Sequence, residues 1–374
     1  MKRLASLGLV LVWLVSGCSA QAAGWPGIAT DGNTVFAVNS GNKLLALKPN
    51  ARLQKLSFPQ PGEWEFPAEK DRLPGTYSNP VLADGVLYLT TYQMGGVPFG
   101  RLYALDPATG RPLREPYNPG GTANSILASP TVVNGTVYFG SGDHKIYAID
   151  AKTFEKKWDY ETRNKVWGSV RVEEGKVFVT SLDHSVYALD ERTGALVWDV
   201  KTGGPIASGV AYDRGTVYAG SADGVLYALS ASGGEKKWAM PTGSWVWNTP
   251  LVRNGVLYAG TLGKKLLAID GATGQLRWSL DTFGNVSAAP LMVGEVLVVG
   301  DESGHVYGVE PSTGTKRWDY ATDPLQPIQA ALTTDGNKIY IMSLNHKVEA
   351  LNPNQPGIPE WRCDTSNADK LCPP

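Results

Sequence analysis

The sequence contains few of the residues from which catalytic and metal sites are usually built, with 3 cysteines and 4 histidines in 374 residues. No two cysteines have the CxxC spacing of metal and dithiol redox sites. The four histidines fall in predicted turns, so no Ser-His-Asp or Cys-His pairing is indicated. No helix is predicted after the glycine-rich stretches, which excludes phosphate-loop and dinucleotide motifs. These absences argue against the common classes of catalytic site.

The chain also lacks an excess of charge of either sign. Lysine and arginine number 34 against 35 aspartate and glutamate, and no basic stripe occurs. Binding to nucleic acid or to a membrane through a polybasic segment therefore has no electrostatic basis. Helical periodicity is missing beyond the N-terminal segment. Instead, 43 glycines punctuate many short apolar runs, which is typical of an all-β protein.

What the sequence does have is a repeat with a period of 40 residues. The period is marked by five evenly spaced tryptophans: Trp158, Trp198, Trp238, Trp278 and Trp318. An apolar phrase such as VYALD at 186–190 precedes each tryptophan, and the turn between them often carries Thr-Gly, as at Thr193 and Gly194. Self-similarity at this period indicates a repeat architecture.

Each repeat divides into four short strands joined by tight turns, as in residues 166–201. Four antiparallel strands of this kind make one propeller blade. Two markers, the turn after the first strand and the apolar phrase of the third, both recur eight times. We therefore predict an all-β, eight-bladed β-propeller of four-stranded blades, closed by packing of blade eight on blade one. The predicted blades one to eight span 27–58, 77–117, 125–161, 166–201, 205–240, 245–281, 286–322 and 328–364.

Blades one, two and eight depart from the repeat. Leu56 and Arg114 stand where blades one and two should carry tryptophan, and Trp361 comes one residue late in blade eight. Two insertions are predicted, at 59–76 between blades one and two and at 92–100 inside blade two. Both would form loops on the same face of the propeller. Such loops are either a binding face or neutral surface variation.

The N-terminus has the pattern of an export signal. Lys2 and Arg3 precede an apolar run at 4–15, which is short for a spanning helix, and the segment ends in Val-Ser-Gly-Cys18. This ending resembles a bacterial lipobox, which implies that Cys18 is lipidated and becomes the mature N-terminus. An extracytoplasmic, lipid-anchored protein is expected, on the periplasmic face of the outer membrane if the cell has two membranes. The expected divisions are a signal peptide at 1–17, a tether at 18–24, the propeller at 25–364 and a tail at 365–374.

The two remaining cysteines, Cys363 and Cys372, lie close together near the C-terminus. In an exported protein such a pair is expected to form a disulfide, which here would hold the last strand and the tail in place.

The phrase Tyr-Ala-Leu-Asp followed by Thr-Gly and Trp, clear at 187–198, resembles the tryptophan-docking repeat of the PQQ (quinoprotein) β-propellers. The resemblance covers essentially 25–364 and implies that the alanine, the glycine and the tryptophan lock neighbouring blades together. A buried indole supplies a large apolar area and needs an acceptor for its N–H, which agrees with that role. The expected docking residues are Trp158, Trp198, Trp238, Trp278, Trp318 and Trp361.

A lipobox joined to this propeller is similar to the BamB-like lipoproteins of the outer-membrane β-barrel assembly machinery. That resemblance implies a non-catalytic, monomeric scaffold that binds a protein partner, with that machinery as the candidate, and has neither cofactor nor metal. The alternative is a dehydrogenase that oxidises alcohols or sugars with PQQ and calcium. That reading lacks the adjacent cysteines which the quinoprotein alcohol dehydrogenases carry over the cofactor.

The histidines are predicted to be turn residues. His144, His184 and His346 share one repeat position with Gly224, and a position shared with glycine favours a turn with positive φ. Acidic residues that could bind calcium, such as Asp143, also fall in these turns. A metal site at these positions is therefore not expected.

One repeat position is of more interest for binding. It lies three residues before the proline of each first strand and holds Gly24, Tyr77, Leu127, Trp167, Ala207, Trp247, Ser287 and Ile328. Because first strands line the central channel, these residues either surround its mouth or pack between blades. Aromatic residues at a concave mouth suit binding of a protein loop or a small apolar ligand. The candidate partner or ligand face comprises Trp64, Tyr77, Tyr92, Trp167, Trp245 and Trp247.

Overall fold

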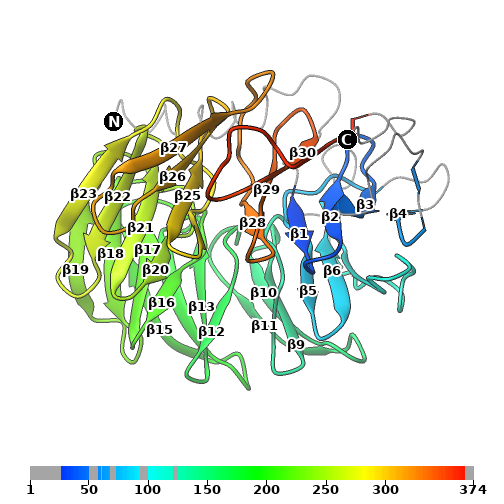
Figure 1. Cartoon of the computed structure of the whole chain (residues 1–374). Coiled ribbons are helices and arrows are strands. Elements are labelled where there is room, and N and C mark those ends of the chain that lie inside the picture. Colours follow the sequence, from blue (N-terminus) through cyan, green and yellow to red (C-terminus); the bar gives the residue numbers. More distant parts are fainter. Residues whose placement is uncertain are drawn as a thin grey trace, which may run out of the picture.

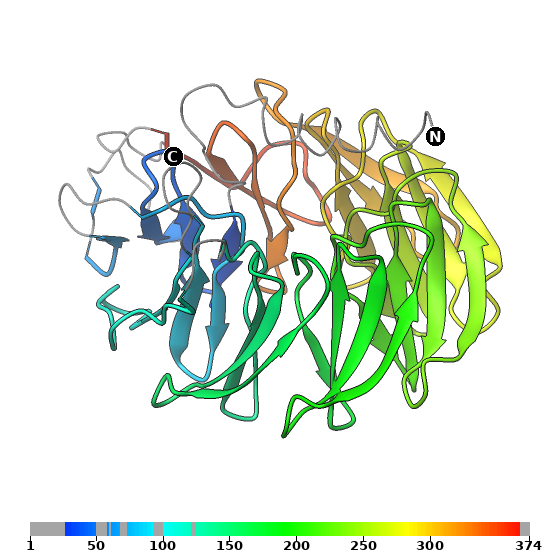
Figure 2. The ribbon, with the colours of Figure 1, turned by 180° about the vertical axis from the view of Figure 1, so that it is seen from behind.

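A computed structural model describes residues 27–49, 58–59, 61–67, 73–92, 100–120 and 125–366. In these residues the chain forms eight antiparallel sheets that follow one another in chain order around a central axis (Figure 1). The view from behind shows the same order, with the last sheet beside the first (Figure 2). The predicted eight-bladed all-β propeller is therefore confirmed.

The strands within each blade pair with their neighbours in sequence, and in blades three to seven they are joined by short turns. Blades one to four contain β1 (Ile28–Thr30), β2 (Val35–Val38), β3 (Leu44–Leu47) and β4 (Trp64–Phe66); β5 (Val81–Ala83), β6 (Val86–Thr90) and β7 (Leu102–Leu105); β8 (Thr131–Val133), β9 (Thr136–Gly140), β10 (Lys145–Asp150) and β11 (Lys156–Glu161); and β12 (Arg171–Glu173), β13 (Lys176–Ser181), β14 (Ser185–Asp190) and β15 (Leu196–Lys201).

Blades five to eight repeat the same arrangement. They contain β16 (Ala211–Asp213), β17 (Thr216–Gly220), β18 (Val225–Ser230) and β19 (Lys236–Pro241); β20 (Leu251–Arg253), β21 (Val256–Thr261), β22 (Lys265–Asp270) and β23 (Leu276–Asp281); β24 (Leu291–Val293), β25 (Val296–Gly300), β26 (His305–Val309) and β27 (Lys316–Ala321); and β28 (Thr333–Thr334), β29 (Ile339–Met342), β30 (Lys347–Leu351) and β31 (Trp361–Asp364).

The ring closes by packing of side chains between blade eight and blade one. Strand β1 contacts β28 and β29, while each blade keeps its own hydrogen-bonded sheet. One core cluster joins Ile28 and Val35 of blade one to Tyr340, Val348 and Trp361 of blade eight. The predicted mode of closure is confirmed. Within the described residues, no helix has the length and apolar character needed to cross a membrane.

Each docking tryptophan links its own blade to the next one. Trp198 on β15 faces the small side chain of Ala188 on β14, and its indole Nε1 donates to the carbonyl oxygen of Ala231 in blade five at 3.2 Å. The next blade receives the ring beside Gly234, whose φ is 80°. A Cβ at that glycine would lie 2.9 Å from the indole, so the position requires glycine for two reasons. The same donated bond is made by Trp64, Trp158, Trp238, Trp278 and Trp318.

Trp64 was predicted to lie in the first insertion and to belong to the partner face, and that prediction is wrong. It lies on β4, the fourth strand of blade one, opposite Ala46 of β3. Its Nε1 donates to Pro107 O at 3.0 Å, and the ring packs against Gly110 of blade two. Blade one therefore extends to Phe66, beyond its predicted end, and Trp64 is its docking tryptophan.

Blade two has only three regular strands in its described residues, whereas four were predicted. The outer edge of β7 pairs only at the isolated bridges Leu102–Tyr117 and Leu105–Pro112. Two prolines, Pro112 and Pro116, interrupt this segment, and proline cannot donate to a ladder. A continuous fourth strand is therefore not formed.

Arg114 takes the place of the docking tryptophan in blade two. Its Nη1 donates to Ala151 O at 3.0 Å. Ala151 has the same repeat position as Glu191, whose carbonyl oxygen accepts from Trp158. The guanidinium carbon lies 4.7 Å from the ring centroid of Phe154. Phe154 has a φ of 60° and stands at the repeat position that Gly194 holds in blade four. A cation on an aromatic ring thus replaces an indole on a glycine.

Candidate functional site

A cavity of about 640 Å³ lies at the mouth of the central channel. It is lined by residues that precede the first strands, such as Trp167 and Trp247, and by residues of the loops between second and third strands, such as Gly142 and Leu182. These two kinds of loop lie on the same side of every blade. We call this side of the propeller the cavity face.

The repeat position that precedes the first strands forms much of the cavity wall. Ile328 has the same repeat position but is fully buried, and Gly24 lies outside the described residues. The six other members all line the cavity: Tyr77, Leu127, Trp167, Ala207, Trp247 and Ser287. The sequence left open whether these residues surround the channel mouth or pack between blades. The structure places these six at the mouth.

The aromatic side chains of the wall are of two kinds. Tyr77 and Tyr92 stack on each other with ring centroids 4.3 Å apart, and Tyr92 is buried, with its N–H donating to Gly75 O at 2.8 Å. Tyr92 is therefore part of the packed wall, not an exposed loop anchor as predicted; residues 93–99 of that insertion lie outside the described residues. Trp167 and Trp247 are half-buried and belong to the wall itself.

Trp245 lies beside the cavity. It lines a much smaller depression together with Leu182, Ala207 and Trp247, which also belong to the cavity wall. The predicted candidate face is thus brought together by the structure except for Trp64, which is used in blade docking.

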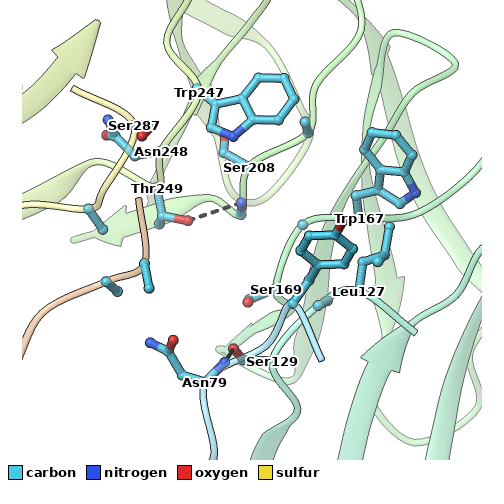
Figure 3. Close-up of a pocket in the computed structure, with 18 of the residues that line it drawn as sticks. Asn79, Leu127, Ser129, Trp167, Ser169, Ser208, Trp247, Asn248, Thr249 and Ser287 are labelled. Atoms are coloured by element: carbon cyan, nitrogen blue, oxygen red, sulfur yellow. Dashed lines mark hydrogen bonds between the residues drawn. The ribbon is translucent and has the colours of Figure 1, made fainter. Parts of the chain in front are cut away.

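Polar groups between the aromatic side chains fix the backbone of the wall (Figure 3). Gly209 N donates to Thr249 Oγ1 at 3.0 Å, and Asn79 N donates to Ser129 Oγ at 2.9 Å. Asn248 is held by two bonds from its Nδ2, to Gly260 O at 3.1 Å and to Val286 O at 2.9 Å. These links join successive blades around the mouth.

Three side-chain atoms at the wall have no hydrogen-bond partner in the described part of the chain. They are Ser208 Oγ, Asn248 Oδ1 and Ser287 Oγ, and all three residues are more than nine-tenths buried. Buried polar atoms are normally paired, so each such exception needs an explanation. Asn248 and Ser208 were not singled out from the sequence. The available signal was their shared repeat position, where Ala128 and Gly168 have no polar side chain.

The cavity wall carries almost no charge. No carboxylate lines it in the described residues, and its one charged side chain is Lys165. The nearby acidic residues of the second-to-third-strand loops are already occupied, as Tyr147 Oη donates to Asp143 at 2.7 Å. Burial would raise the pKa of Asp183, but hydrogen bonds from Tyr187 and from the Arg163 N–H hold it below its usual value.

These residues do not fit a calcium-bound quinone cofactor. Calcium requires six to eight oxygen ligands, usually with several carboxylates, and the described wall offers none. No group of three or more His, Cys, Asp or Glu side chains that could hold a metal occurs in the described residues. A tricarboxylic quinone would also meet only the single cation of Lys165.

Three of the four histidines occupy turns, as predicted, whereas His305 is the first residue of strand β26. The φ values of His144, His184 and His346 are 73°, 72° and 60°, and that of Gly224 is 77°. These residues therefore adopt the left-handed conformation that the shared glycine indicated. The remaining sites fall partly outside the described residues. Cys18 and Cys372 lie there, while Cys363 is buried on β31, so lipidation and the disulfide stay predictions.

The geometry defines the class of the protein as an eight-bladed propeller of tryptophan-docked, PQQ-like blades with an uncharged, aromatic-lined mouth. A family model described as outer membrane protein assembly factor BamB matches residues 62–180, 99–203 and 182–373. The chain belongs to this family.

Solved structures share the fold. BamB from Moraxella catarrhalis aligns with a TM-score of 0.67 at 19% identity, covering 84% of this chain and 92% of that one. The computationally designed Ika8 protein aligns with a TM-score of 0.73 at 16% identity, covering 89% of this chain and 97% of that one. At these identities the likeness concerns the fold alone.

Curated relatives include quinone-dependent dehydrogenases. Quinohemoprotein alcohol dehydrogenase ADH-IIG of Pseudomonas putida is 28% identical over 178 residues, which are 43% of this chain and 24% of that protein. The 1-butanol dehydrogenase (cytochrome c) of Thauera butanivorans is 35% identical over 106 residues, 26% of this chain and 14% of that protein. The chain thus spans less than a quarter of the length of these enzymes.

Proposed function

We propose that this chain is a non-catalytic scaffold of outer-membrane protein assembly, which binds a protein partner through the cavity face. The observation that carries the proposal is the large cavity on that face, aromatic in its lining and uncharged except for Lys165. Large rigid aromatic groups in a concave setting are the usual anchors of protein interfaces. Membership of the assembly-factor family supports the same role.

Exposed apolar side chains also occur in loops of the cavity face. Phe283 and Leu325, which are 60% and 55% exposed, lie in the connections that precede blades seven and eight. Leu344, in the loop between β29 and β30, is also exposed. Exposed apolar groups that gather on one face are typical of an interaction surface. We call Phe283, Leu325 and Leu344 the rim.

A quinone-dependent dehydrogenase is the second candidate, favoured by the local similarity to alcohol dehydrogenases. That similarity is confined to 43% and 26% of this chain. The cavity wall has no carboxylate in its described residues for calcium. We therefore place this candidate second, without cofactor or metal in the proposed function.

The proposed location is the periplasmic face of the outer membrane, where lipid on Cys18 would hold the propeller as a monomer close to the bilayer. The membrane and a protein of the β-barrel assembly machinery are the proposed contacts. No nucleic acid is among them, since the sequence has no basic stripe.

The rim is tested by charge introduction. In the double variant Phe283→Glu and Leu325→Glu, two carboxylates would have to be desolvated on binding. Co-purification of a β-barrel assembly protein from detergent-solubilised envelopes, measured by mass spectrometry, is expected to fall at least about tenfold, which corresponds to about 1.4 kcal/mol.

The matched control is Leu196→Glu with Leu276→Glu. These leucines are 45% and 49% exposed and stand on the fourth strands β15 and β23, outside the cavity face. The control should recover the partner like the wild type. Equal recovery by both double variants would contradict binding through the cavity face, and PQQ-dependent dye reduction by the purified protein would establish the dehydrogenase instead.

A further inference from the structure

The geometry points to a more specific role for the cavity: it is a socket for an uncharged segment of the partner chain, which inserts one aromatic side chain between Trp167 and Trp247. This inference rests on the proposed function and adds the chemistry of the bound segment. It is carried by the order of side chains around the mouth, by unpaired polar atoms in the wall and by the charge of the lining.

The order of side chains around the mouth places a small residue between two indoles. Trp167, Ala207 and Trp247 hold the same repeat position in blades four, five and six, and all three line the cavity. The small Ala207 between two indoles leaves space where its neighbours fill it, and the adjoining depression shares Ala207 and Trp247. Figure 3 shows Trp167 and Trp247 as separate rings, with Ser208 close to Trp247. A cavity of about 640 Å³ falls within the range of sites that take small molecules or short peptide segments.

The unpaired polar atoms indicate what else the occupant must carry. Ser208, Asn248 and Ser287 belong to blades five, six and seven, so their unpaired oxygens lie along one side of the mouth. The Nδ2 group of Asn248 already donates twice, so its Oδ1 can only accept. The two serine hydroxyls can donate. A peptide backbone supplies both the N–H and the C=O that these groups lack.

A buried polar atom without a hydrogen-bond partner destabilises the structure that holds it. Each of the three residues lines the cavity, so an occupant of the cavity is the nearest source of the missing partners. A purely hydrocarbon occupant would leave them unpaired. A peptide segment with an aromatic side chain can do both: its ring packs against the indoles, and its backbone forms hydrogen bonds with the polar atoms.

The charge of the lining restricts the sequence of that segment. The described wall has no carboxylate to pair with lysine or arginine, and only Lys165 could pair with an acidic group. Burying an unpaired charge is costly. The segment is therefore a neutral one, of the kind Gly-Ser-Phe-Ser-Gly, and a charged side chain in place of its aromatic residue should not enter.

The socket is tested by filling it. Ala207→Trp places a third indole at a position where the two neighbouring blades already carry one, so the backbone accommodates it. Ala207→Ser is the matched control, which changes the same residue without filling the space. The probe is the acetylated and amidated peptide Gly-Ser-Phe-Ser-Gly, titrated into the full-length protein by calorimetry, beside the same peptide with Glu or Lys in place of Phe.

We expect the Phe peptide to bind the wild type and Ala207→Ser at least about tenfold more tightly than it binds Ala207→Trp. We expect the Glu and Lys peptides to bind the wild type at least about tenfold more weakly than the Phe peptide. Equal binding of the three peptides, or of the Phe peptide to all three proteins, would overturn the inference. A second ligand, maltotriose, is titrated in the same way. If maltotriose binds the wild type but not Ala207→Trp, and the Phe peptide binds neither protein, the cavity is a saccharide site and the inference is overturned.

Should Ala207→Trp fail to fold, by circular dichroism and thermal unfolding, Ser208→Ala replaces it. That variant removes one of the unpaired hydroxyls and breaks no side-chain hydrogen bond of the wall, and it should weaken binding of the Phe peptide by the same criterion. The proposed socket and the proposed rim can be contradicted independently of each other. If Ala207→Trp retains the cellular partner while Phe283→Glu with Leu325→Glu loses it, the proposed function stands and the socket does not.

Discussion

Replacing Trp198 by alanine is expected to lower the free energy of unfolding by about 3–5 kcal/mol, as for other core tryptophans. Trp198 is 8% exposed, packs against blade five beside Gly234, and donates its indole N–H to Ala231 O. Truncation would leave a cavity between two blades and an unpaired carbonyl. Equilibrium denaturation in urea, followed by circular dichroism, measures the change.

Trp167→Ala is the matched control, because it removes the same side chain from the cavity wall, where the ring is half-buried. Its cost should be about 1 kcal/mol, the typical effect of a single substitution. An equal or larger loss of stability in Trp167→Ala than in Trp198→Ala would show that the repeated tryptophans are not what locks the blades together.

Cys18→Ser is expected to move nearly all of the protein from the membrane fraction to the soluble fraction. The apolar run at 4–15 would be removed with the signal peptide, and no helix of the described residues could cross a membrane in its place. Stable anchoring by acyl chains depends on burying their methylene groups, at about 0.8 kcal/mol each. Fractionation of cells, with metabolic labelling by a fatty-acid analogue, measures the distribution and the modification.

Ala20→Ser serves as the control for the region, since it leaves the cysteine in place and should stay with the membrane and be labelled. A wild-type protein that is soluble and carries no lipid would contradict the anchor. It would leave the argument for the propeller and its cavity unchanged, because the strands of the described blades begin at Ile28.

The regular blades could be predicted from the sequence because one physical requirement recurs in each of them. A tryptophan must find a small residue on its own third strand and a glycine in the next blade, as Trp158 finds Ala148 and Gly194. Three residue types recurring in phase fix the number of blades and their order. Closure by packing also followed, since each predicted blade was complete in itself.

Trp64 escaped this reasoning because the connection before the fourth strand of blade one is longer than in the regular blades. Trp64 comes 18 residues after its partner Ala46, whereas Trp158 comes 10 residues after Ala148. A signal was nevertheless present in the next blade. Gly110 stands at the receiving position of blade two, and a glycine kept there indicates an indole in the blade before.

The converse holds at the following interface. Phe154 occupies the receiving position of blade three, which indicates that no tryptophan arrives from blade two, and the structure places Arg114 on that ring. The cavity was harder to predict. The cavity depends on residues that differ from one blade to the next, namely Ala207 between Trp167 and Trp247, and Asn248. The repeat pattern does not show which of these side chains meet in space, because that depends on how the blades are arranged around the axis.

Whether the cavity face is where the partner binds is tested most directly by photocrosslinking in living cells. A photoreactive phenylalanine analogue placed at Phe283 lies on the rim, and the same analogue at Leu276 lies on a fourth strand away from it, with comparable exposure of 60% and 49%. Binding through the cavity face predicts one discrete adduct with a protein of the outer-membrane assembly machinery from position 283 and none from position 276. An adduct from position 276 alone, or from neither position, would contradict it.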